Sequence, residues 1–137
     1  MEVVIIGGIA AGMSIAAKAK RTNRKANITV IEKENYVSFG ACGLPYYLGG
    51  QFDDGDRMMV RTPDEAVNID FDLKEGKIKD LKTGEFKIKK YDKVAITTGA
   101  MPVMPNLEGI DKDNVYSITR LNAVDKLKSN LNDIKKQ

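Results

Sequence analysis

Glycines followed by an acid at a fixed spacing are the first feature of this sequence that could do chemistry. Residues 3–12 read VVIIGGIAAG, and Glu32 stands twenty positions after Gly12. Glycines permit a tight turn and a close backbone approach, and the N–H groups that open a following helix favour a phosphate. A carboxylate at this spacing can accept hydrogen bonds from ribose hydroxyls. The pattern predicts a dinucleotide site, although Ile9 replaces one glycine of the usual fingerprint; the alternative is a strand–helix–strand unit whose glycines serve packing only.

Cys42 is the second candidate for chemistry. Pro45 suits the first turn of a helix, so Cys42 is expected at or just before a helix N-terminus. There the helix dipole favours a thiolate, which is the reactive form of cysteine. An inert core cysteine is the alternative that the local sequence leaves open. Because the chain has no second cysteine and no histidine, it cannot form an internal disulfide, and a metal site or a Ser–His triad is not expected.

Three short apolar runs predict the parallel sheet that would position the glycine turn. They cover residues 3–6, 28–31 and 94–97, and their β-branched residues suit strands covered on both faces. The third run ends in Thr98 and Gly99, where backbone amides could face a ligand at the carboxyl edge of the sheet. Read alone, that ending could equally be a glycine turn between domains.

The remaining elements would cover this sheet in a three-layer α/β core. A turn at Thr83 and Gly84 predicts a hairpin over residues 77–89, and residues 68–72 look extended. Residues 62–65 resemble a helix start. Apolar positions at helical spacing predict a last helix, which carries a core or partner-facing stripe: Leu121, Val124, Leu127, Leu131 and Ile134.

Composition limits the possible functions. The chain has 137 residues, of which 42% are hydrophobic and 30% charged, as expected for one globular domain. We find no membrane-spanning run and no targeting segment, so we expect a cytoplasmic protein without a membrane partner. A net charge of +3 is too small to indicate nucleic acid. A basic cluster near the end of the first helix either complements the helix dipole or binds phosphates: Lys18, Lys20, Arg21, Arg24 and Lys25.

Together these segments resemble the pyridine nucleotide-disulfide oxidoreductases, flavoproteins that pass electrons from NAD(P)H through FAD to a sulfur centre. The resemblance implies a Rossmann-like FAD-binding fold, which is incomplete here. Its flavin-contacting positions fall on Gly7, Gly8, Ile9, Ala10, Ala11, Gly12, Glu32, Lys33, Thr98, Gly99, Ala100 and Arg120.

The segment SFGACGLPY at residues 38–46 is similar to the active-site segment of the family's single-cysteine branch. This branch contains coenzyme A-disulfide reductases, CoA-persulfide reductases, NADH oxidases and NADH peroxidases. The oxidases and peroxidases carry a histidine where Ala10 stands, so the coenzyme A reductases match better. Relatives have Asn where Ala41 stands. CoA-contacting positions fall on Ser14, Lys18, Arg21 and Ser38.

The mechanism that this resemblance implies centres on Cys42. NADH reduces FAD, the reduced flavin cleaves a mixed disulfide between Cys42 and CoA, and the thiolate then attacks the next CoA disulfide or persulfide. An oxidase or peroxidase would instead oxidise Cys42 to a sulfenic acid.

Relative to this family, residues 1–137 are expected to be the N-terminal portion of an FAD-binding domain. About twenty residues, including a parallel strand, are missing near residues 66–68 by resemblance. We find no second glycine fingerprint for NAD(P)H and no dimerisation domain, so this chain alone is not expected to turn over NADH. The uncovered core predicts a homo-oligomer or a partner chain, and a non-enzymatic nucleotide-binding or subunit-interaction module is a further alternative.

Overall fold

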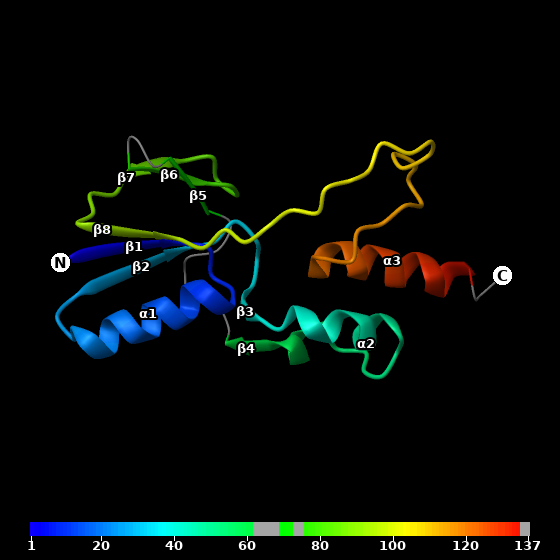
Figure 1. Cartoon of the computed structure of the whole chain (residues 1–137), viewed down its shortest axis with the longest axis horizontal. Helices are drawn as coiled ribbons and strands as arrows, with labels where there is room; N and C mark the ends of the chain where they lie inside the picture. Colours follow the sequence, from blue (N-terminus) through cyan, green and yellow to red (C-terminus); the bar gives the residue numbers. More distant parts are fainter. Residues whose placement is uncertain (62–68, 73–75, 135–137) are drawn as a thin grey trace. The chain divides into compact units, whose positions relative to one another are not determined.

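The computed structural model describes residues 1–61, 69–72 and 76–134 (Figure 1). Its contacts divide the chain into two compact units. The first unit comprises Met1–Phe39 and Met59–Gly99, and the second comprises Gly40–Met58 and Ala100–Gln137. The predicted helix start at residues 62–65 and the predicted deletion at 66–68 lie outside the described residues. The assignment of residues 1–137 to one FAD-binding domain stays a prediction.

A parallel sheet with strand order β2-β1-β8 forms the centre of the first unit. Strand β1 (Glu2–Ile6) pairs with β2 (Asn27–Ile31) on one side and with β8 (Lys93–Ile96) on the other. Val4 and Ile5 of the central strand are completely buried, as β-branched residues in a doubly covered parallel strand should be. The three predicted parallel strands are confirmed.

Helix α1 and a second sheet cover this parallel sheet on opposite faces (Figure 1). Helix α1 (Ala10–Thr22) links β1 to β2. The second sheet is antiparallel and contains β5 (Ile69–Asp72), β6 (Lys77–Asp80) and β7 (Phe86–Ile88). This arrangement confirms the three-layer α/β fold and the predicted hairpin.

A short antiparallel pair completes the first unit. Strand β3 (Val37–Phe39) pairs with β4 (Met59–Arg61). Tyr36 and Phe39 are buried in contact with each other, with ring centroids 4.9 Å apart. The pairing of β3 with β4 holds the chain in place at the point where the chain leaves the first unit after Phe39 and returns to it at Met59.

The second unit consists of short helices and α3. It contains the single-turn helices η1 (Ala41–Gly43) and η2 (Gly55–Met58), helix α2 (Leu44–Leu48) and helix α3 (Leu121–Ile134). Its buried apolar residues come from α2, η2 and α3: Leu44, Tyr47, Met58, Leu121 and Val124. The predicted last helix is confirmed, and Leu121 and Val124 are the core positions of its stripe. No helix in the described part of the chain is long and apolar enough to cross a membrane.

Candidate nucleotide and thiol sites

The glycine turn has no room for larger side chains. Gly7 has a φ of +103°, and a Cβ on it would lie 2.3 Å from the carbonyl oxygen of Thr97. A Cβ on Gly12 would lie 1.7 Å from the carbonyl oxygen of Gly7, because α1 begins directly against the end of β1. On Gly8 it would lie 2.9 Å from Cγ1 of Val37. These glycines allow the close approach of strand and helix that a dinucleotide turn requires.

Glu32 holds this turn from the end of β2. Its Oε2 accepts a 2.6 Å hydrogen bond from the N–H of Gly8, and its Oε1 accepts one of 3.0 Å from the N–H of Glu34. The side chain is buried, with 6% of its surface exposed. Each carboxylate oxygen has a second lone pair, so Glu32 can anchor the turn and still accept a hydrogen bond from a ribose. Lys33, the next residue, is exposed.

The N-terminus of α1 is open to an anion. Ile9 occupies the N-cap position without a side-chain cap, and the first turn contains no acidic residue. The first α-helical bond runs from the N–H of Met13 to the carbonyl of Ile9, so the N–H groups of residues 10–12 have no partner within the helix. Ala10 and Ala11 are exposed. A pyrophosphate fits these groups, because they combine free donors, the positive end of the helix dipole and no competing carboxylate.

Thr97 ties the end of β8 to the glycine turn. Its Oγ1 donates to the carbonyl of Ile6 at 2.8 Å and lies 2.9 Å from the carbonyl oxygen of Gly7. Gly99 has a φ of +69°, and no atom lies within 4 Å of the position of a Cβ on it. Thr98 and Gly99 are therefore exposed beside the turn, on the open carboxyl side of the sheet where the sequence predicts a ligand contact.

Ser38 is held in an unusual conformation. Its φ is +52°, the one positive value outside glycine in the described residues, and its N–H donates to the carbonyl of Gly8 at 2.8 Å. A left-handed serine costs free energy that the surrounding structure must supply, and such residues cluster at functional sites. The structure thus joins Ser38, a predicted CoA contact, to the predicted FAD turn.

The other predicted CoA contacts lie along one exposed face of α1. Ser14, Lys18 and Arg21 are spaced by four and three residues, so they share a face, and all three are exposed. Lys20, by contrast, already has a partner within the chain: its Nζ donates to the carbonyl of Ala26 at 2.8 Å. Lys20 and Arg21 both lie in the last turn of α1, as the helix-end interpretation expects, but the Ala26 carbonyl lies outside the helix. Phosphate binding by the exposed Lys18 and Arg21 stays a prediction.

Cys42 lies in the second unit as the middle residue of η1, directly before α2, which confirms its predicted place at a helix start. Its side chain is exposed, so the inert-core alternative is wrong. The segment is fixed by Met58, whose carbonyl accepts the N–H of Gly40 at 2.8 Å. A Cβ on Gly43 would lie 2.7 Å from Sδ of Met58, so a larger residue after Cys42 would require the Met58 side chain to move.

Helix α3 braces the helix that follows Cys42. The hydroxyl of Tyr47 donates to Asp125 at 2.9 Å. Nζ of Lys128 donates to the carbonyls of Tyr47 and Phe52 and pairs with Asp53 at 3.0 Å. The same ammonium lies 4.0 Å from the centre of the Tyr47 ring. Burial, followed by the hydrogen bond to Asp125, raises the pKa of Tyr47 to about 12.

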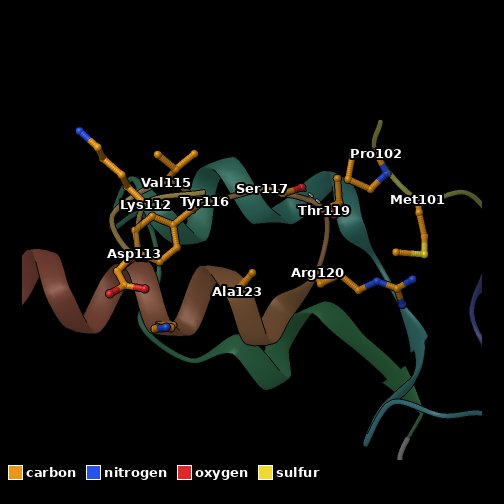
Figure 2. Close-up of a pocket in the computed structure, with 11 residues that line it drawn as sticks. Met101, Pro102, Lys112, Asp113, Val115, Tyr116, Ser117, Thr119, Arg120 and Ala123 are labelled. Carbon is orange, nitrogen blue, oxygen red and sulfur yellow. Dashed lines mark hydrogen bonds between the residues drawn. The ribbon is translucent and has the colours of Figure 1, made fainter. Parts of the chain in front are cut away.

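Arg120 borders a groove of about 430 Å³ in the second unit. Figure 2 shows Arg120 and Met101 at one end of this groove and Lys112 and Asp113 at the other. Ala100 lies just before the segment that forms one wall and is exposed. The flavin contacts predicted for Arg120 and Ala100 stay predictions, because these residues and the glycine turn belong to different units.

Sequence reasoning missed three residues that shape the candidate sites, two at the glycine turn and one beside Cys42. Thr97 and Val37 contact its glycines, and Tyr47 is buried behind the Cys42 segment. The threonine at the end of a predicted strand was a usable signal for Thr97, since its hydroxyl can satisfy carbonyls at a strand end. The contacts of Val37 and Tyr47 depend on tertiary packing and have no local sequence signal. In the described residues, no cluster of acidic, cysteine or histidine side chains could hold a metal ion.

Comparison with known proteins identifies similar chains. The family model described as pyridine nucleotide-disulphide oxidoreductase matches residues 1–136. An NADH oxidase of Methanocaldococcus jannaschii is 33% identical over 132 residues, which cover 86% of this chain and 29% of that protein. The structure of an NAD-dependent persulfide reductase from A. fulgidus is 32% identical with a TM-score of 0.85, over 97% of this chain and 27% of that one. Reduced Bacillus anthracis CoADR-RHD is 28% identical with a TM-score of 0.89, over 98% and 27%. The chain thus spans less than a third of the length of these relatives.

Proposed function

Because this chain belongs to the pyridine nucleotide-disulphide oxidoreductase family, we propose that it forms the FAD-binding portion of a disulfide oxidoreductase of the coenzyme A-disulfide reductase type. The family uses FAD and NAD(P)H, and the chain has the family's Rossmann-like FAD-binding fold. One observation carries the proposal: the sterically closed glycine turn, anchored by Glu32, lies at the uncapped N-terminus of α1.

The residues that would hold FAD follow from this geometry. The N–H groups of residues 10–12 would bind the pyrophosphate, Glu32 would accept from the ribose, and the exposed Thr98–Gly99 backbone would face the cofactor. When bound, FAD supplies a two-electron carrier between NAD(P)H and sulfur. Lys33, Ala100 and Arg120 are additional proposed contacts.

The proposed role of Cys42 is thiol–disulfide exchange. Its thiolate attacks one sulfur of a CoA disulfide, forms a mixed disulfide and expels the other CoA as a thiolate. Two electrons then release the second CoA and restore the thiolate. The exposed side chain of Cys42 supports this role, and Ser14, Lys18, Arg21 and Ser38 would recognise the phosphates and polar groups of CoA.

Two alternatives use the same fold. One relative is an NADH oxidase, which favours a fragment of an oxidase or peroxidase whose cysteine cycles through a sulfenic acid. The lack of histidine in the chain argues for the CoA type. A non-enzymatic nucleotide-binding or subunit-interaction module is the other alternative. For the complete enzyme we propose that it is cytoplasmic and that it oxidises NADH or NADPH.

Titration with FAD tests the nucleotide site. We expect the purified chain to bind FAD with micromolar or tighter affinity, followed by flavin absorbance and fluorescence. Ala11→Glu places a carboxylate in the exposed first turn of α1, where it stabilises the helix by about 0.3–1 kcal/mol but repels the pyrophosphate. This variant should melt no lower than the wild type and bind FAD at least about tenfold more weakly, whereas Ala11→Gln should bind almost normally. Equal FAD affinity in the wild type and both variants would show that the pyrophosphate does not bind at α1.

Mass spectrometry of Cys42 tests the sulfur chemistry. The reduced chain should gain one CoA from CoA disulfide, and Cys42→Ser should gain none. Arg21→Ala should slow this reaction severalfold but leave the reaction with the uncharged hydroxyethyl disulfide unchanged, because only CoA carries phosphates. Arg24→Ala is the matched control. A stable sulfenic acid after peroxide treatment, together with no CoA adduct, would favour the oxidase or peroxidase alternative.

A further inference from the structure

One largely buried ammonium group joins three segments of the second unit. Lys128 lies in α3, and only 15% of its side chain is exposed. Its Nζ donates to the carbonyl of Tyr47 in α2 at 3.2 Å and to the carbonyl of Phe52 at 3.3 Å. It also pairs with Asp53 at 3.0 Å and lies 4.0 Å from the centre of the Tyr47 ring. A single side chain therefore fixes the C-terminal end of α2, and the loop that follows it, onto α3.

The other end of α2 carries Cys42. The single turn η1 continues directly into α2, and the N–H of Leu44 donates to the carbonyl of Ala41 across the junction. Leu44 is buried, whereas the side chain of Cys42 is exposed. Because α2 has only five residues and is continuous with η1, the position of the thiol depends on how both ends of α2 are held.

A lysine is an unfavourable choice for this place if stability is its only role. Lys128 continues the buried face of Leu121 and Val124, at spacings of three and four residues. Taking an ammonium out of water costs free energy, and an apolar side chain in such a place is often neutral or stabilising. An apolar side chain would not bind the two carbonyls, however. Hydrogen bonds in fixed directions define one position of α2, because a fully satisfied buried polar network makes the surrounding structure rigid.

We propose that Lys128 is a positioning residue for Cys42: its ammonium holds the C-terminal end of α2 in one place, and α2 in turn fixes the thiol for attack on a CoA disulfide. This role rests on the proposed thiol–disulfide exchange of Cys42. A fixed thiol favours a substrate that the protein also holds, because the two sulfurs then meet in one geometry. Hydroxyethyl disulfide lacks the phosphates of CoA, so its reaction requires only an exposed thiol. The ratio of the two rates therefore reports positioning.

The rates of adduct formation at Cys42 test this role by mass spectrometry. Lys128→Met should lower the rate with CoA disulfide, relative to the rate with hydroxyethyl disulfide, by about threefold or more. The ratio is compared because partial unfolding changes both rates together. Lys128→Arg keeps a cation that can bind carbonyls and stack on Tyr47, so it should retain the wild-type ratio. Lys126→Met removes an exposed lysine of the same helix and is the matched control, which should leave the ratio unchanged.

Hydrogen exchange separates this role from the proposed function. The amides of α2 should exchange faster in Lys128→Met than in the wild type, because local opening of the helix no longer breaks the hydrogen bonds of the ammonium. An unchanged ratio in Lys128→Met, an equal loss in Lys126→Met, or a loss that Lys128→Arg shares would overturn the proposal. If the wild type forms no CoA adduct, the proposed function is wrong, and hydrogen exchange alone decides on Lys128. Unchanged exchange would then overturn its positioning role, and faster exchange would support it.

Discussion

Tyr47 is the residue whose environment most changes its chemistry. It is buried, its hydroxyl donates to Asp125, and Lys128 lies over its ring. Burial first, and then the hydrogen bond and the nearby aspartates, raise its pKa from 10.0 to about 12. These interactions favour the neutral phenol, because a phenolate would lie buried beside a carboxylate.

We therefore expect one tyrosine to ionise late in a spectrophotometric titration. Because the folded pKa is above the unfolded value, the stability that Tyr47 contributes is fully present below pH 10 and is lost as pH rises through about 12. Tyr47→Phe should remove the late step from the tyrosinate absorbance. Tyr46→Phe, which changes an exposed neighbour, should retain it. If an ionisation at high pH persisted in Tyr47→Phe, the raised pKa would belong to another tyrosine.

The glycines of the candidate nucleotide site were predictable because steric rules fix them. A glycine at position 12 is required wherever a helix starts against the strand before it, and its Cβ would meet the Gly7 carbonyl at 1.7 Å. The role of Glu32 was predictable only in part. Spacing predicts a ribose contact for its carboxylate, whereas its hydrogen bond from the N–H of Gly8 depends on the course of the folded backbone.

At the level of elements, the strongest local patterns gave correct predictions. The parallel strands follow from runs of β-branched residues, and α3 follows from apolar residues at helical spacing. Strands β3 and β4 were not predicted, because three residues are too few to show an alternating pattern. Their pairing joins Val37 to Arg61 and Phe39 to Met59, which is a long-range contact.

The brace between α3 and α2 also depends on long-range contacts. Lys128 reads as an ordinary surface lysine in the sequence, yet only 15% of its side chain is exposed. Its ammonium binds carbonyls of residues 47 and 52, near the C-terminal end of α2, where a cation is favourable. Solvation and packing together fix its position, and neither is visible in a local window of sequence.

At the level of the whole molecule, the proposed FAD surface belongs to the first unit. It consists of the glycine turn, the start of α1 and Glu32. Anything that binds only the folded chain stabilises it, so FAD should raise the melting temperature.

FAD binding predicts a measurable thermal stabilisation. FAD at about 100 times its Kd should stabilise the chain by about 2.7 kcal/mol and raise its melting temperature by roughly 5–10 °C. Ala11→Gln should keep this rise, because it adds no charge to the first turn of α1. Ala11→Glu should lose most of the rise, because its carboxylate repels the pyrophosphate. Differential scanning fluorimetry over a series of FAD concentrations measures the effect. A rise in Ala11→Glu as large as in the wild type would contradict pyrophosphate binding at the start of α1.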